Sequence, residues 1–100
     1  MSTYVRKDVR GNWKAETDFP LSDTKRLKLS TSKVSTGHLV TTLTGCTVDG
    51  IWETHELHKD FYKRLEVSKP GRVTEKAVTE QHNKFNINDL VTEAKAFYKL

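Results

Sequence analysis

The stretch TKRLKLSTSKVSTGHLVTTLTGCTV, residues 24–48, decides the fold class of this 100-residue chain. Near its start, Leu27 and Leu29 alternate with Arg26 and Lys28. An apolar side chain at every second position is typical of a β-strand with one buried face, so the leucines are expected to face a core and the cations to face solvent. The stretch therefore predicts antiparallel β-structure.

The residues before this stretch show the same period of two. After the turn signal at residues 10–12 (Arg-Gly-Asn), apolar or Thr residues alternate with charged ones over 13–19. Residues 4–9 can form the preceding strand, which would complete a first hairpin. Pro20 is expected to end the second strand.

The second half of the stretch predicts another strand, but its pattern slips by one residue. Leu39 and Leu43 share one parity, whereas Cys46 and Val48 share the other, and Gly45 lies between the two pairs. A β-bulge at Gly45 would absorb one residue and bring all four side chains to one face. On this interpretation Cys46 is a small core residue rather than a reactive thiol.

A hairpin is expected next, at Asp49-Gly50, a dipeptide typical of tight turns between strands. The returning strand would run over residues 51–57. The segment 59–67 is ambiguous, because Phe61 and Leu65 fit a helical spacing while the same segment also alternates like a strand.

The last part of the chain, residues 72–100, has helical character. Thr74 is expected to cap a first helix, and Asn88 to cap a second. The second helix would present an apolar stripe formed by Leu90, Val91, Ala94, Phe97 and Tyr98. The two segments could form a helical hairpin or one kinked helix.

Strands followed by helices without alternation predict an α+β domain. We expect residues 1–100 to form a single domain that is β-rich over 1–58: an antiparallel β-meander of four to five strands, followed by one or two C-terminal α-helices that pack on the sheet.

Composition limits the function classes. The chain has no apolar run long enough to cross a bilayer and no apolar leader at its start, and its single cysteine excludes an intrachain disulfide. These features predict a cytoplasmic protein with no membrane partner.

No motif specifies a reaction or a metal. His55 and His58 in THELH are two histidines without the paired cysteines of a structural zinc site. The chain lacks a nucleophile elbow and a phosphate-binding glycine loop. We therefore expect a protein that is not an enzyme and that uses no metal and no cofactor.

The charge distribution gives the main functional clue. Residues 1–48 carry eight Lys and Arg against four Asp and Glu, whereas residues 49–100 carry nine of each. Cations, hydroxyls and an aromatic ring on one sheet are the usual inventory of a surface that binds single-stranded nucleic acid. The predicted contact residues are Arg6, Lys7, Arg10, Trp13, Lys14, Lys25, Arg26, Lys28 and Lys33.

A second hypothesis is a protein–protein interaction adaptor or regulator. Such a protein would act through an open sheet edge or through the C-terminal helix, which ends in AKAFYKL. A homodimer is expected under either hypothesis, because two-fold self-association is common among small proteins.

Overall fold

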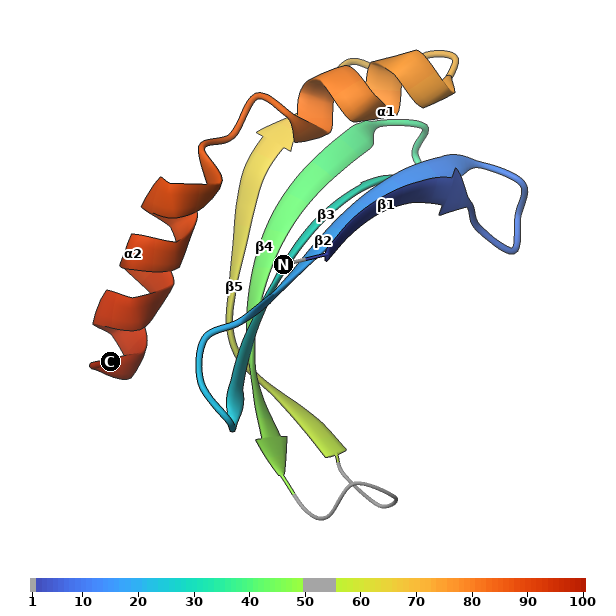
Figure 1. The fold of residues 1–100 in the computed structure, drawn as a ribbon. Helices are drawn as coiled ribbons and strands as arrows, with labels where there is room; N and C mark the ends of the chain where they lie inside the picture. The colour runs from blue at the N-terminus through green and yellow to red at the C-terminus, as the bar shows by residue number, and fades with distance from the viewer. Residues whose placement is uncertain (1, 50–55) are drawn as a thin grey trace.

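The computed structural model describes residues 2–49 and 56–100 of the chain. Five strands form one antiparallel sheet in the order β1-β2-β3-β4-β5, and two helices follow (Figure 1). This architecture confirms the predicted α+β meander with C-terminal helices. The elements are β1 (Ser2–Lys7), β2 (Trp13–Pro20), β3 (Lys25–Lys33), β4 (Leu39–Asp49), β5 (Glu56–Val67), α1 (Glu75–His82) and α2 (Ile87–Tyr98).

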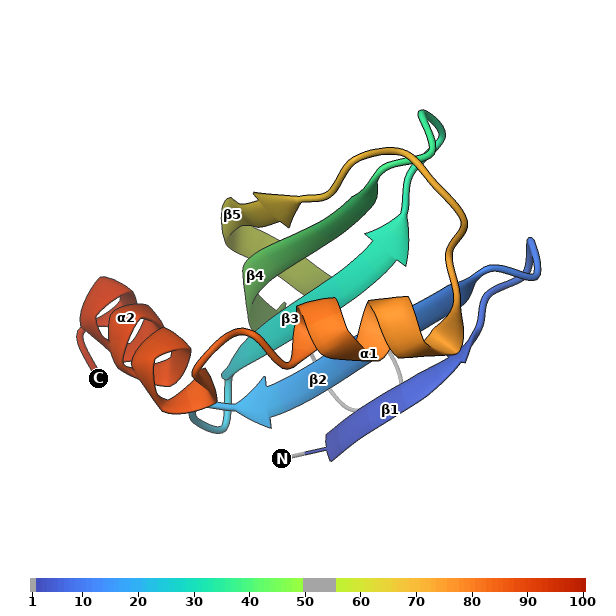
Figure 2. The same cartoon turned by 90° about the horizontal axis from the view of Figure 1, so that it is seen from above.

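The sheet bends strongly, and both helices lie on its outer, convex side (Figure 1). Seen from above, α1 crosses the sheet over β2 and β3, while α2 lies beyond one end of α1 (Figure 2). The opposite, concave face carries no described helix, and we call it the open face. Neither helix in the described ranges is long and apolar enough to span a bilayer.

The predicted alternation in β2 and β3 is confirmed. Leu27 and Leu29 are fully buried, whereas Arg26 and Lys28 are exposed. The two strands pair with continuous register from Ala15 opposite Thr31 to the end of β2. Because directly opposed residues share a face, this register fixes which side chains lie under the helices and which lie on the open face.

The predicted bulge is present, but its extra residue belongs to β5 rather than β4. Gly45 pairs with Phe61 and Cys46 with Lys59, so Asp60 is the inserted residue. The β3–β4 register runs through Gly45 without interruption. Cys46 therefore lies on the open face, away from the core, and the prediction that it joins Leu39 and Leu43 on one face is wrong.

Strand β5 also resolves the ambiguous segment 59–67, which is a strand throughout. A second irregularity leaves Leu65 without a directly opposed residue, because Thr41 pairs with Glu66 and Thr42 with Arg64. Each β-bulge bends and twists its strand, and two of them in β5 account for the strong bend of the sheet. Gly50 of the predicted Asp49-Gly50 turn and the returning residues 51–55 lie outside the described residues.

Helix α1 begins as predicted, with the Thr74 hydroxyl accepting a hydrogen bond from the Ala77 amide at 3.1 Å. Helix α2 begins earlier than predicted, because Asn86, not Asn88, caps it by accepting from the Asn88 amide at 3.0 Å. The two helices are separate elements that cover different parts of the sheet, so they form neither a hairpin nor one kinked helix (Figure 1).

Two apolar clusters hold the helices on the sheet. Under α2, Leu90 and Ala94 pack against Leu27, Leu29 and Leu43. Under α1, a smaller cluster consists of Ala15, Leu39 and Val78, with Val5, Trp13 and Val73 packed against it.

A chain of buried polar side chains crosses the sheet beneath α1. The His82 ring lies between Thr17, at 2.7 Å from Nε2, and Thr31, at 2.8 Å from Nδ1. The Thr31 hydroxyl also lies 2.8 Å from that of Thr41, which accepts from the Gln81 amide nitrogen at 3.0 Å. All five residues are at most 4% exposed, so these hydrogen bonds replace water that the side chains cannot reach.

The hydrogen bonds of this chain run in one direction. The Leu39 carbonyl can only accept, so the Gln81 nitrogen, 3.1 Å away, must donate to it, and this fixes the orientation of the amide. The Thr41 hydroxyl accepts from Gln81, and Thr31 is the partner that can take its hydrogen, so that Thr31 in turn donates to His82 Nδ1. A hydroxyl can accept twice, but the reverse direction would leave the buried Thr41 hydrogen without an acceptor, at a cost of about 1–3 kcal/mol. The ring therefore carries its hydrogen on Nε2 and donates to Thr17.

Candidate nucleic-acid interface

The open face of the sheet carries most of the cations that the strands contribute. Its residues follow from the register: they alternate with the buried ones along each strand. Among the described residues of this face, six are cationic and two are anionic, which leaves an excess of four positive charges. The cations are Arg6, Lys14, Arg26, Lys28, Lys59 and Arg64, and the anions are Glu16 and Asp18.

Glu16 organises the centre of this face. Its carboxylate lies 2.6 Å from Lys14 Nζ and 2.8 Å from Lys28 Nζ, and it accepts a hydrogen bond from the Tyr4 hydroxyl at 3.0 Å. Burial alone would raise the pKa of Glu16, but the hydrogen bonds from Lys14, Lys28 and Tyr4 lower it to about 2. One carboxylate thus fixes two lysines and leaves the group with one net positive charge.

A second ion pair lies beside this group. Arg26 Nη2 is 3.3 Å from Asp18 Oδ2, and both side chains are about half exposed. Exposed pairs of this kind contribute little to stability, typically about 0–1 kcal/mol. The Arg26 guanidinium therefore exchanges partners at low cost, which suits contact with a phosphate.

Aromatic rings and hydroxyls complete the open face. Tyr4 is 37% exposed and Tyr62 is 59% exposed, on strands at opposite edges of the sheet. The hydroxyl residues between these edges are Ser30, Ser32, Thr42 and Thr44.

The structure places the nine predicted contact residues in three regions. Arg6, Lys14, Arg26 and Lys28 lie together on the open face. Arg10 lies in the β1–β2 turn, where its amide donates to Asp8. The register puts the other four on the helix side of the sheet: Lys7, Trp13, Lys25 and Lys33.

Packing explains why Trp13 and Lys25 lie on the helix side. Trp13 packs against the apolar cluster beneath α1, with Lys7 Nζ 5.3 Å from its ring centroid. Lys25 Nζ lies 5.0 Å from the Tyr98 ring and donates to Thr47 at 2.7 Å. The sequence already indicated that Trp13 and Lys14 lie on opposite faces, because consecutive residues of a strand cannot share a face.

Four open-face residues were missed by the sequence reasoning: Tyr4, Lys59, Tyr62 and Arg64. Three of them belong to β5, which could not be assigned from its pattern. Tyr4 lies two residues before Arg6 in the same strand, and this spacing could have indicated that the two side chains share a face.

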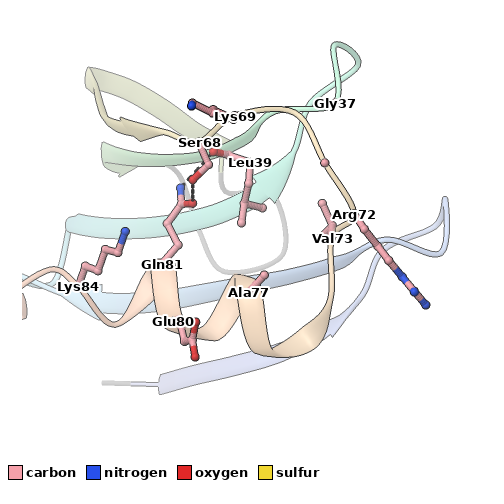
Figure 3. A pocket seen from close by; sticks show the side chains of 11 residues that line it. Gly37, Leu39, Ser68, Lys69, Arg72, Val73, Ala77, Glu80, Gln81 and Lys84 are labelled. Carbon is pink, nitrogen blue, oxygen red and sulfur yellow. Dashed lines mark hydrogen bonds between the residues drawn. The ribbon is translucent and has the colours of Figure 1, made fainter.

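A separate hollow of about 230 Å³ lies between α1 and the connection that precedes it (Figure 3). Its polar floor is formed by Ser68 and Gln81, which hydrogen-bond to each other. The Arg72 side chain extends away from the hollow (Figure 3), and Lys84 pairs with Glu66 at 3.2 Å. Its polar floor and Lys84 are therefore engaged within the protein, and this hollow is a weaker candidate than the open face.

Cys46 has the chemistry of an unreactive thiol. It is half-buried on the open face, opposite Arg26. Burial raises the pKa of the Cys46 thiol, and the Asp60 carboxylate raises it further. The thiolate required of a nucleophile is therefore scarce at neutral pH.

Within residues 2–49 and 56–100, no group of three or more His, Cys, Asp or Glu side chains is placed to hold a metal ion. His55 of the THELH segment lies outside the described residues. Both ring nitrogens of His82 are hydrogen-bonded, one to Thr17 and the other to Thr31.

Comparison with protein-family models, with curated proteins and with solved structures gave no significant match.

Proposed function

We propose that this protein binds single-stranded nucleic acid along the open face of its sheet, through weak and sequence-tolerant contacts. The observation that carries the proposal is that, among the residues the structure describes, the strand register brings six cations and two anions to one concave face. A phosphate backbone is attracted by such a local excess, whatever the base sequence.

The distribution of helices supports a single strand over a duplex. Sequence readers of duplex DNA usually insert a helix or a two-stranded ribbon into the major groove. Here both described helices pack on the opposite side of the sheet (Figure 2). A sheet face with tyrosines and hydroxyls instead suits unstacked bases and a flexible backbone.

Salt titration tests this proposal. Binding of a fluorescein-labelled oligothymidine, followed by anisotropy, should weaken log-linearly with salt concentration. For single strands the slope changes by about 0.7 for each phosphate contact, so replacing Arg26 and Lys28 by Ala should reduce it by about 1.4.

The matched control removes two cations from the helices. Lys76 and Lys95 are exposed on α1 and α2, and replacing both by Ala changes the net charge by the same amount. This variant should keep the wild-type slope. Absence of binding at low salt, or an equal change of slope in the control, would refute the proposal.

A second candidate function is that of a protein–protein adaptor, acting through α2. Phe97 contacts the rings of Phe61 and Tyr98 but remains 54% exposed, and Leu100, three residues further along the chain, is 57% exposed. Replacing Phe97 by Glu should abolish capture of a specific partner, or self-association measured by sedimentation, without altering the thermal unfolding midpoint. Unchanged association would exclude this surface.

A further inference from the structure

A hollow of about 370 Å³ opens on the open face, where β4 and β5 meet the β3–β4 turn. Ligand pockets usually measure about 300–1,000 Å³, so this hollow suits a small ligand group. The residues that give it its chemistry are Val34, His38, Val40, Tyr62, Arg64 and Val67.

The hollow gathers exposed apolar surface. Val34 is 38% exposed, Tyr62 59% and Val67 45%, although soluble proteins bury most side chains of this size. Val40, at 8% exposed, forms its floor and pairs with Val67 across β4 and β5. A ligand with a flat apolar surface would cover all four side chains.

His38 and Arg64 supply its polar chemistry. The His38 Nδ1 lies 2.8 Å from the Ser68 carbonyl oxygen, which can only accept. In the neutral ring Nδ1 therefore carries the hydrogen, and Nε2 remains as an acceptor for a ligand. The Arg64 guanidinium adds a cation with several donors.

We propose that this hollow is a nucleobase subsite: one base of the bound strand stacks on Tyr62, and its phosphate contacts Arg64. This inference rests on the proposed function. A nucleotide combines the three properties that the hollow matches, namely a planar apolar surface, N–H groups for His38 Nε2 and an adjacent negative charge. The net positive charge of the open face favours this occupant over a purely apolar one.

The test compares two labelled strands of equal length and equal phosphate number, oligothymidine and a fully abasic strand. Stacking of a base on an aromatic ring should make the wild-type protein bind oligothymidine about 5- to 150-fold more tightly. The variant Tyr62→Ala should bind both strands with the affinity that the wild type shows for the abasic strand, and with an unchanged salt slope. Tyr62→Phe keeps the ring and should keep the preference.

Phe97→Ala is the matched control, because it removes an aromatic ring of similar exposure, 54%, from α2 on the opposite side of the sheet. It should retain the preference for oligothymidine. Tyr62 is more than half exposed, so the Ala variant is expected to fold, which circular dichroism and the unfolding midpoint will check.

The outcomes separate this inference from the proposed function. Equal binding of the two strands by the wild type, retention of the preference in Tyr62→Ala, or loss of the preference in Phe97→Ala overturns the nucleobase subsite and leaves phosphate binding intact. Failure to bind either strand at low salt overturns both. Tyr62-dependent binding of an acidic, tyrosine-containing peptide, without base preference, would assign the hollow to a protein partner instead.

Discussion

Protonation of His82 should destabilise the fold, because the ring is buried and both of its nitrogens lie within hydrogen-bond distance of threonine hydroxyls. In the direction that gives every hydroxyl hydrogen of the buried chain an acceptor, the neutral ring accepts from Thr31 at Nδ1 and donates to Thr17 from Nε2. A protonated ring would have to donate from both nitrogens, which would reverse the hydrogen bonds of Thr31 and Thr41 and leave one hydrogen without an acceptor. Burial lowers the pKa of His82, although the Glu16 carboxylate partly opposes this shift.

The sign and the pH range follow from that lowered pKa. Below about pH 6.5, the ordinary value for histidine, the unfolded chain binds a proton that the folded chain does not. The contribution of neutral His82 to the free energy of unfolding should therefore be fully present above about pH 7. It should be lost as the pH is lowered toward the pKa of the folded state. One proton corresponds to a slope of about 1.4 kcal/mol per pH unit. The loss over a single pH unit would matter, because the total free energy of unfolding of a small domain is only about 5–15 kcal/mol.

Urea denaturation between pH 7.5 and pH 5 measures this slope. The control is His82→Gln, whose amide can donate and accept but does not titrate. Because the other three histidines remain in both proteins, the wild type should lose more stability than the variant as the pH falls, by at most about 1.4 kcal/mol per pH unit. Equal slopes would refute the reasoning, and so would an NMR spectrum that places the His82 hydrogen on Nδ1 at neutral pH.

Three further predictions concern single residues. Gly45→Ala should destabilise the fold by about 1–3 kcal/mol or more, because the new Cβ would lie 2.1 Å from the Phe61 ring. In the control Gly71→Ala, the new Cβ has nothing within 4 Å, so this variant should be nearly neutral. Urea midpoints compare the two variants, and equal losses of stability would contradict the steric explanation. Wild type should lose up to about 3 kcal/mol as the pH falls from about 4.5 toward 2 and Glu16 becomes protonated, and Glu16→Gln should lack this component of acid unfolding. Cys46 should react with iodoacetamide at pH 8 more slowly than free cysteine, because its pKa is raised; a rate equal to that of the free amino acid would contradict this.

The parts of the fold that could be predicted from the sequence are those with an undisturbed local period. The alternation in β2 and β3 and the cap at Thr74 depend on neighbouring residues alone. Strand β5 could not be assigned, because its bulges at Asp60 and Leu65 interrupt the period of two. The bulge signal at Gly45 was read on the wrong strand, since the glycine accommodates the Phe61 ring and the inserted residue lies opposite it.

The candidate site was predictable only in part, for a related reason. Parity along β1, β2 and β3 indicates which cations share a face, but the contribution of Tyr62 and Arg64 requires the register of β5. The buried polar chain could not be predicted at all. Thr17, Thr31 and Thr41 look like solvent-facing hydroxyls until Gln81 and His82 are placed above them.

The two helices are held on the sheet by different forces, and temperature should separate them. Helix α2 is docked by Leu90 and Ala94 on a leucine cluster, whereas α1 combines a smaller apolar cluster around Val78 with hydrogen bonds from Gln81 and His82. Exposing apolar surface raises the heat capacity and exposing polar groups lowers it, so the attachment of α2 weakens more on cooling. Near 0 °C the chain is therefore expected to release its C-terminal helix first and to keep α1 on the sheet.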